Sequence, residues 1–570
     1  MRSLAAAAGT AVCATLVLVP APRLRAQGAQ GAQGALESPT LAAMQDELKR
    51  SLAGLRLKDE PSPYYIAYEV DDVSDTTLQA RLGAIVEDGA RRIRALRVEV
   101  RVGDYAFDSS RFVGPNRGGG SDGAVLAPLD DDYDAMRREI WLATDAAYKR
   151  AVNVFARKKA AFQNRTSTEA IPDFSKETPI ETVLPMAAPG RLNREGLDWV
   201  RQISTVFASS PDVHSSDVSL SESRGTRYYV NSEGFKSVVP IQSASLLVSA
   251  DTQADDGAML RDSFSVVENR AQDMPRVSDV VARARDLASR LTAARAAPVG
   301  EEYTGPVLIE GEASAELIAQ ALVPLMLARR APDTESPGGG GGGGRGNFAA
   351  QVTPFLTRIG LRVLPDAFSV SDTPSLAQYG GKPVPGAYAV DDEGVAAKDV
   401  ALVENGKLVT LLTSRTPQRK LLQSNGHGRG GTAQAGVFQM RSAQAIPSAE
   451  LKKKYLELLK VQDKPFGYIV RGIGDASGPG SGPSILQLAK VTPDGREEIV
   501  RGLRFASIAP PTFRNILEAS EERQVYSYFT GSAGTVVSVV VPSLIFEELE
   551  IQKVQDVTQR SPIVPSPLKN

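Results

Sequence analysis

The sequence of 570 residues contains one cysteine, Cys13, and two histidines, His214 and His427. Cys13 lies in an N-terminal segment that is expected to be removed, so a mature chain without cysteine can form neither disulfides nor cysteine-containing zinc sites. The histidines are more than two hundred positions apart, and the sequence has no His-Glu-x-x-His motif. Because 42% of the residues are hydrophobic, the chain must fold by burying apolar surface, and its length suffices for two or three domains.

The N-terminus has the pattern of a secretory signal. Arg2 precedes an uncharged apolar stretch over residues 4–19, and Leu24-Arg25-Ala26 places a small residue before Gln27. We expect a signal peptide over residues 1–26, cleaved after Ala26, and a low-complexity tether over residues 27–37. A retained anchor is the alternative. The mature protein is then exported, periplasmic or extracellular, and no later segment is apolar enough to span a membrane.

The charge balance argues against nucleic acid as a partner. Lys and Arg total 65 against 67 for Asp and Glu, giving a net charge of −2. Nucleic-acid binders usually carry a basic excess on at least one domain. The basic run 452–454 lies in a helical pattern whose other face carries Leu451, Tyr455, Leu458 and Leu459, and it is interpreted as a solvated helix face.

Hydrophobic periodicity predicts an α+β protein, with an N-terminal mixed α/β region followed by a β-rich C-terminal domain. The predicted regions are 38–125 (α/β), 126–170 (one long amphipathic helix, about 131–162), 171–300 (a middle α/β region), 301–555 (the β-rich domain) and 556–570 (a tail). Before residue 300 the strands are expected at 64–70, 81–86, 96–105, 218–221, 226–230, 237–248 and 263–267. Ser278 is expected to cap a helix.

In the C-terminal half, a strand over 305–310 is expected to lead into a helix over 313–330 that contains Pro324. Further strands are expected at 387–390, 400–404, 407–413, 484–491, 497–501 and 535–541. Asn405-Gly406 and Pro493-Asp494-Gly495 are typical hairpin turns. The seven glycines 338–344 are not followed by Gly-Lys-Ser/Thr, so they predict a surface loop and no phosphate site.

Motifs for known hydrolytic chemistry are missing. The sequence has no Gly-x-Ser-x-Gly, and its Ser-x-x-Lys, Ser566 to Lys569, falls in the tail. Asp391, Asp392 and Glu393 precede Gly394 and are interpreted as a turn. His427 lies in a glycine-rich loop that is not expected to hold a ligand rigidly, and His214 approaches a strand.

Several segments of the C-terminal half occur in an order that resembles the TldD/PmbA family, long labelled "modulator of DNA gyrase" and peptidase U62. They are 386–395, 402–408, 411–415, 424–426, 500–505 and 541–549, with an Asn-Ser-x-Gly turn at 231–234. The resemblance covers about residues 200–555 and implies the family's fold for the C-terminal domain.

The resemblance also locates a missing motif. Catalytic TldD-type subunits carry His-Glu-x-x-x-His on a helix and a cysteine much later. If the register holds, Ala319, Gln320 and Pro324 occupy the motif positions here, and residues 530–540 contain no cysteine. The chain therefore resembles the TldE/PmbA-type subunit, which lacks the zinc motif, and we expect no catalytic or metal-binding residue in it.

The resemblance implies a non-catalytic subunit of an exported metallopeptidase complex that acts on short unfolded peptides. Its partner would be a TldD-type homologue that carries the zinc, and the two would form a heterodimer. Asp392, Glu393, Asn425 and His427 are the residues expected at a peptide groove or interface. A stand-alone peptide-binding or scaffold protein is the alternative, and an enzyme with a non-zinc mechanism is a third, for which no residue set stands out.

Overall fold

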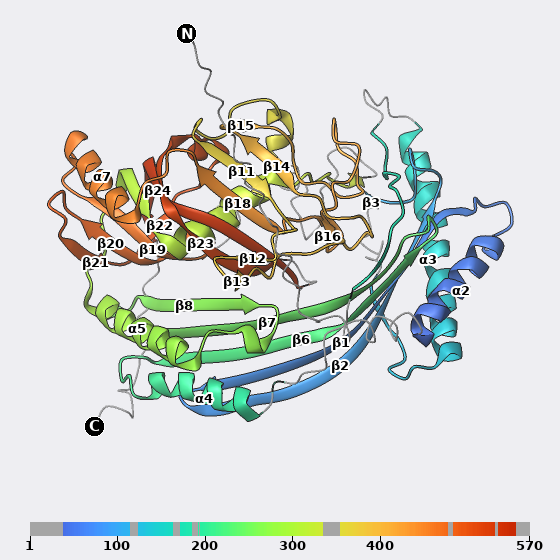
Figure 1. The fold of residues 1–570 in the computed structure, drawn as a ribbon, viewed down its shortest axis with the longest axis horizontal. Helices are drawn as coiled ribbons and strands as arrows, with labels where there is room; N and C mark the ends of the chain where they lie inside the picture. The colour runs from blue at the N-terminus through green and yellow to red at the C-terminus, as the bar shows by residue number, and fades with distance from the viewer. Residues whose placement is uncertain are drawn as a thin grey trace, which may run out of the picture.

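The structure is a computed structural model that describes residues 38–113, 123–163, 171–184, 192, 194–334, 354–476, 483–530 and 534–554. The expected signal peptide, tether, seven-glycine run and C-terminal tail lie outside these ranges. Within them the chain forms two layers, a long curved sheet and a β-rich domain that lies above it (Figure 1). The expected α+β class, with a β-rich C-terminal domain, is confirmed.

The long sheet has the order β4-β2-β1-β6-β7-β5, with β8 also paired to β7. Its main strands are unusually long for a globular protein, where five or six residues are common. They are β1 (Pro63–Arg81), β2 (Ala84–Val102), β6 (Ser215–Asn231), β7 (Lys236–Gln253) and β8 (Met259–Glu268), with β4 (Val125–Leu126) and β5 (Glu181–Val183) at the margins. Strands from the predicted regions 38–125 and 171–300 thus share one sheet.

The strand predicted over 81–86 is interrupted by a hairpin turn at 82–83, so Arg81 ends β1 and residues 84–86 begin β2. Leu82 and Gly83 both have positive φ, 46° and 82°, as a two-residue turn between β1 and β2 requires. The strands expected at 64–70 and 96–105 overlap β1 and β2, and those at 218–221 and 226–230 are parts of β6. Polar residues interrupt the apolar alternation in the middle of these strands. The sequence pattern therefore stops there, although the strand itself continues.

Helices cover the sheet in two places. The helices α2 (Pro39–Gly54) and α3 (Tyr133–Phe162) pack on one half of β1 and β2, and the predicted long helix is confirmed as α3. Two more helices, α4 (Arg194–Ala208) and α5 (Val277–Ala296), pack beneath the other half (Figure 1). Ser278 lies inside α5, and its expected cap position is taken by Arg276.

The C-terminal domain is built on an eleven-stranded sheet with the path β15-β14-β11-β18-β24-β22-β20-β19-β9. Strand β9 pairs with both β19 and β24, so the sheet closes on itself as a barrel. Its strands are β9 (Tyr303–Ile309), β11 (Phe368–Asp372), β14 (Val400–Glu404), β15 (Lys407–Leu408), β18 (Val437–Ser442), β19 (Gly467–Ala476), β20 (Pro483–Val491), β21 (Glu497–Val500), β22 (Leu503–Phe505), β23 (Ile516–Thr530) and β24 (Thr535–Lys553).

Both predicted hairpins of this domain are confirmed. Asn405 and Gly406 join β14 to β15 with φ of 47° and 77°, and 493–495 join β20 to β21. The strand predicted over 407–413 is shorter, and 387–390 forms a single bridge at Val390. Outside the barrel, α7 (Ser448–Val461) turns Leu451, Tyr455 and Leu459 inward, while the run 452–454 is partly exposed.

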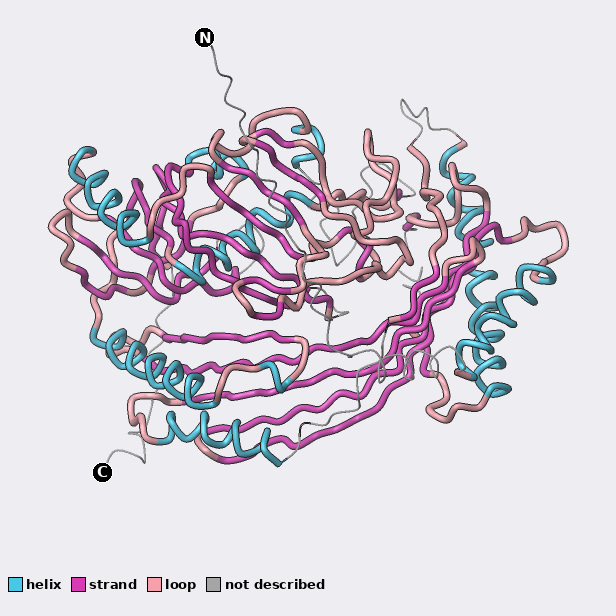
Figure 2. The backbone as a smooth tube through the Cα atoms, in the orientation of Figure 1, coloured by secondary structure: helices cyan, strands magenta, loops and turns pink. Residues whose placement is uncertain are grey.

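The described part of the chain contains no helix that is long and apolar enough to cross a membrane. In the tube view, the strands of the long sheet run beneath the C-terminal domain and then bend sharply upward beside it (Figure 2). One face of this sheet is therefore turned toward the C-terminal domain.

Gly225 tests how tightly the long strands pack. It pairs with Val73 of β1, and a Cβ atom there would lie 2.0 Å from the Asp72 carbonyl oxygen. We expect Gly225→Ala to lower the free energy of unfolding by about 1–3 kcal/mol, because backbone must move. Gly89→Ala is the control, since the nearest atom to its Cβ would be a carboxylate oxygen at the end of the Glu87 side chain, at 3.3 Å. Urea denaturation followed by circular dichroism measures both, and equal midpoints would contradict the packing argument.

Candidate functional site

The segment at the positions of the absent zinc motif changes helix type twice. After α6 (Gly311–Leu317), residues Ile318–Leu322 form a π-helical turn, η2, and Val323–Met326 a 3₁₀ turn, η3. The backbone N–H of Val323 donates to Ile318 O, five residues earlier. Pro324 follows and has no N–H to continue the α-helical ladder, which accounts for the break. The predicted helix over 313–330 is therefore irregular and ends at Met326.

A π turn brings residues five apart to the same side, whereas in an α-helix they lie about 140° apart. Ala319 and Pro324 have this spacing, as do the two histidines of His-Glu-x-x-x-His. Ala319 is nevertheless buried in the barrel core, and Pro324 is exposed. Gln320 is the one position of the three with a polar side chain, and its Nε2 lies 3.5 Å from Gly474 O.

The donor set at this segment does not fit a zinc ion. Alanine and proline side chains offer no ligand atom, and glutamine is a poor one for zinc. Glu316, one turn earlier, uses its carboxylate to accept from Ile473 N at 3.1 Å. Burial and the neighbouring Glu312 raise the pKa of Glu316 to about 8. Across the described residues, no three His, Cys, Asp or Glu side chains gather closely enough to hold a metal.

His427 is fully buried and firmly held, which the glycine content of its loop did not indicate. Its Nε2 lies 3.2 Å from Asp372 Oδ1, and its Nδ1 lies 3.0 Å from Asn425 Oδ1. Asp372 in turn accepts from the backbone N–H groups of Gly436 and Val437. His214 stands in a different setting, exposed and one residue ahead of β6.

Asn425 fixes this loop to the strand segment beside it. Its Oδ1 accepts from Thr413 N at 2.8 Å, and its Nδ2 donates to Leu411 O at 3.0 Å. Every polar atom of its side chain therefore has a partner within the chain. The two segments 411–415 and 424–426, both part of the family resemblance, are joined through this side chain and through bonds of the Ser424 and Thr413 hydroxyls.

Asp392 connects the C-terminal domain to the long sheet. It forms an ion pair with Arg227 of β6 and accepts from Gly430 N at 2.7 Å. Arg227 also binds Asp71 of β1 through two bonds, of 2.7 and 2.9 Å. Burial would raise the pKa of Asp392, but Arg227 and Arg429 outweigh it and hold that pKa below its usual range. The carboxylate is thus charged and held across the two layers.

Arg415 makes a second connection, and it is completely buried. Its guanidinium donates to Glu233 Oε1 at 2.9 Å and to Ser175 O at 2.6 Å. Two guanidinium groups contact the ring of Phe174. The Arg415 Cζ atom lies 3.9 Å from the ring centroid and the Arg101 Cζ atom lies 3.7 Å from it. Such contacts add cation–π attraction to the ion pairs.

Glu393 completes this junction from the C-terminal side. Its Oε2 accepts from Arg415 N at 2.6 Å. Burial raises the pKa of Glu393 to about 7. Asp391 beside it accepts from Val395 N and Gly428 N, and burial together with Glu393 raises its pKa well above the usual range. The expected turn at 391–394 is therefore also an acidic, inward-facing cluster.

The structure thus brings Asp392, Glu393, Asn425 and His427 into one region, at the junction between the barrel and the long sheet. The sequence did not indicate their partners, Arg227, Arg415, Asp372, Glu233 and Asp71. Glu233 could have been identified from the sequence, because it lies in the Asn-Ser-Glu-Gly turn that was part of the resemblance. Arg415 is the last residue of the segment 411–415, which was also part of the resemblance. Neither segment, however, indicates that Arg415 and Glu233 form an ion pair.

A cavity of about 410 Å³ lies beside this junction, on the face of the long sheet that is turned toward the C-terminal domain. Strand alternation places small hydroxyl side chains there, with Ser221 opposite Ser245 and Ser223 opposite Ser243. The whole lining is Asp71, Val73, Asp75, Ile93, Ala95, Ser221, Ser223, Arg227, Ile241, Ser243, Ser245, Phe529 and Gly534. Asp71 and Arg227 both belong to this lining, so their ion pair forms part of the cavity wall.

Comparison with known proteins agrees with this geometry. Residues 302–553 match the PmbA/TldA metallopeptidase C-terminal domain. The resemblance of the C-terminal half to the TldD/PmbA family is confirmed over these residues. No curated protein matches the sequence.

Solved structures share the fold at low identity. A modulator of a DNA gyrase from Thermotoga maritima is 14% identical, with a TM-score of 0.57, covering 86% of this chain and 96% of that one. TldE from Thermococcus kodakarensis is 14% identical, with a TM-score of 0.55 and coverage of 89% and 99%. A modulator of DNA gyrase from Bacteroides thetaiotaomicron is 11% identical, with a TM-score of 0.55 and coverage of 91% and 99%. At such identity the likeness concerns the fold alone.

Glu393 makes the junction sensitive to pH. Its folded-state pKa of about 7 lies above the usual 4.5, so between these values the folded state binds more protons than the unfolded state. Stability should therefore fall as the pH rises through this window. Glu393→Gln keeps a neutral side chain in place, and we expect a shallower pH dependence of the unfolding midpoint between about pH 5 and pH 8. Exposed Glu498→Gln should leave the slope unchanged, and identical slopes in all three proteins would contradict this assignment.

Proposed function

We propose that this chain is the non-catalytic, TldE/PmbA-like subunit of an exported TldD-type metallopeptidase complex. The observation that carries the proposal is the segment at the motif positions, where the family's domain is kept but Ala319, Gln320 and Pro324 supply no zinc ligand set. A fold retained without its chemistry is most simply explained by a role in assembly. The zinc would then be held by the partner, a TldD-type homologue with His-Glu-x-x-x-His.

The substrates would be short unfolded peptides. Support comes from the serine-lined cavity, whose small side chains leave room beside the sheet and whose hydroxyl, carboxylate and guanidinium groups can bond to a peptide backbone. Such contacts hold a chain with little regard to its sequence. The ion pair between Arg227 and Asp392 fixes this wall, so the cavity would keep its shape when a partner binds.

The first test is assembly with a partner. A TldD-type homologue from the same host is co-expressed with this chain, and the mixture is analysed by size exclusion. We expect one stable heterodimer, with an interface that buries more than ~1,200 Å² in total. The partner with its motif Glu replaced should form the same complex and cut nothing. Two independent species, with a partner cleavage rate that does not respond to this chain, would leave the stand-alone peptide-binding protein as the function.

A second measurement separates assembly from chemistry. In the complex, Gln320→Ala should leave both assembly and the cleavage rate of an unstructured peptide unchanged, because the proposal gives Gln320 no part in the reaction. A tenfold fall in cleavage with the complex intact would mean that this chain takes part in catalysis.

The purified chain alone should hold far less than one zinc ion after dialysis against trace zinc. Neither histidine has a second ligand at metal-site spacing, and His427 is enclosed by Asp372 and Asn425. Elemental analysis gives the content, with the TldD-type homologue as the positive control. One tightly held zinc per chain would refute the expectation.

Export is part of the proposal and is tested separately. The protein recovered from its native host should begin at Gln27, because the segment 1–26 has the pattern of a cleaved signal. N-terminal sequencing of the soluble exported fraction decides this, whereas a chain that starts at Met1 and fractionates with the membrane would indicate an anchor.

A further inference from the structure

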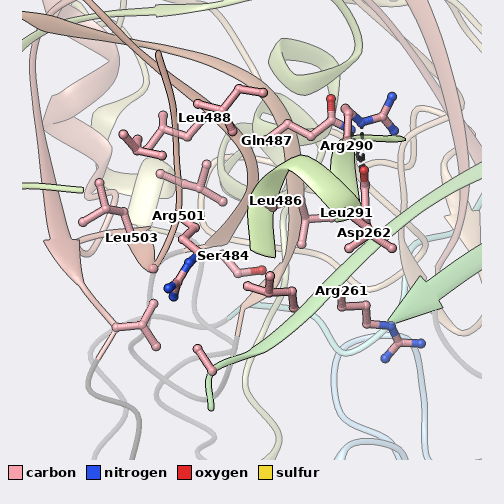
Figure 3. Close-up of a pocket in the computed structure, with 18 of the residues that line it drawn as sticks. Arg261, Asp262, Arg290, Leu291, Ser484, Leu486, Gln487, Leu488, Arg501 and Leu503 are labelled. Carbon is pink, nitrogen blue, oxygen red and sulfur yellow. Dashed lines mark hydrogen bonds and ion pairs between the residues drawn. The ribbon is translucent and has the colours of Figure 1, made fainter. Parts of the chain in front are cut away.

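A second cavity, of about 320 Å³, lies away from the junction, between the long sheet and the barrel (Figure 3). Its walls come from the start of β8, from the last turns of α5 and from β20, β21 and β22. The volume is at the lower end of the range of ~300–1,000 Å³ that is usual for small-ligand pockets.

The cavity exists because strand pairing is interrupted there. One edge of β20 pairs with β21 at Leu488–Val491 and with β22 at Ser484. Between these pairings, Ile485–Gln487 has no strand on that edge among the described residues. The outer edge of β8 also has no strand partner in the described chain. The four consecutive residues Met259–Asp262 all line the cavity, so it meets β8 along its edge, where backbone N–H and C=O groups point outward.

The walls are largely apolar. Leu291 of α5, Leu488 of β20 and Leu503 of β22 are buried side chains that line the cavity. Ile485 and Ile499 add branched aliphatic surface. Such a wall favours an apolar group of a ligand, because filling it removes hydrocarbon surface from water.

The lining also carries more positive than negative charge, with five arginines and one aspartate. Arg290 pairs with Asp262 at 2.9 Å, at the end of the cavity opposite Arg501 (Figure 3). Arg471 is bound by two glutamates from outside the cavity, and Arg501 by one aspartate. These three cations are therefore already balanced.

The remaining positive charge of the lining belongs to Arg261 and Arg504. Among the residues that the structure describes, no acidic side chain forms an ion pair with either of them. Arg504 is half-buried and Arg261 is exposed. A guanidinium beside an apolar wall binds a carboxylate well, because it offers several donors in one plane.

We propose that this cavity binds a small ligand that combines an apolar chain with a carboxylate, the apolar part against the leucine walls and the carboxylate at Arg504. A medium-chain fatty acid and the C-terminal residue of an apolar peptide share this chemistry. The unpaired edges of β8 and β20 can also bond to an amide, which only the peptide offers. The site requires this chain alone and stands whether or not the partner subunit exists.

The test uses the full mature chain and isothermal titration calorimetry with three probes: octanoate, N-acetyl-leucine and N-acetyl-leucine amide. We expect the two carboxylates to bind at least tenfold more tightly than the amide. Tighter binding of octanoate would identify a fatty acid as the source, and tighter binding of N-acetyl-leucine a peptide end. Equal binding of amide and carboxylates, or no binding of any probe, would overturn the proposal.

Two pairs of variants locate the site. Arg504→Gln should reduce the preference for carboxylate over amide to near unity, whereas Arg496→Gln, on an exposed arginine of the nearby β20–β21 turn, should not. Ala294→Phe should fill the cavity and weaken both carboxylates at least tenfold. Ala293→Phe, at the neighbouring exposed position of α5, should leave binding intact. If Ala294→Phe binds the probes as the parent chain does, with circular dichroism showing it folded, the ligand lies elsewhere and the proposal fails.

Failure of this test leaves the subunit hypothesis untouched, because heterodimer formation is measured without these probes. Conversely, a chain that never meets a partner can still bind the carboxylates. The two proposals are therefore refuted by different results.

Discussion

The arrangement of the two layers depends on a buried arginine. Arg415 carries its charge where no water reaches it, a position that is unfavourable unless the charge is paired. Glu233, in the turn between β6 and β7, pairs with this charge, the carbonyl oxygen of Ser175 accepts from the guanidinium, and the ring of Phe174 packs against it. Since these partners come from regions far apart in the chain, the arginine is satisfied only when the sheet and the barrel are assembled. The nearby ion pair between Asp392 and Arg227 also forms only when the barrel and the long sheet are in contact.

The C-terminal loops that lie at this contact have a structural role. Asp392, Glu393, Asn425 and His427 each have hydrogen-bond or ion-pair partners within the chain. Asp392 binds Arg227 of the long sheet, whereas the bonds of Glu393, Asn425 and His427 hold the C-terminal loops to one another.

Much of the fold could be predicted from the sequence where one physical signal dominated. The long amphipathic helix α3 and the Asn405-Gly406 hairpin are such cases, because apolar spacing and positive-φ turn residues act locally. The continuity of β1 and β6 could not be predicted, since Asp72, Asp75 and Arg224 interrupt the apolar pattern inside strands that other strands pair on both sides. The environment of His427 depends on Asp372, which is 55 positions away in the sequence. A local sequence pattern cannot indicate a partner at that distance.

The central place of β24 has a consequence for how the chain acquires its structure. This strand pairs with β9, β18, β22 and β23, and its partner β9 lies more than two hundred residues earlier in the sequence. The barrel therefore cannot close until residues 535–553 have been synthesised, and its strands remain as open edges until then. Closure over so long a separation is slow. Until β24 has been synthesised, the edges of β9 and β22 that it pairs with are exposed. Exposed strand edges promote aggregation, so this is the stage of synthesis at which binding by a chaperone would protect the chain.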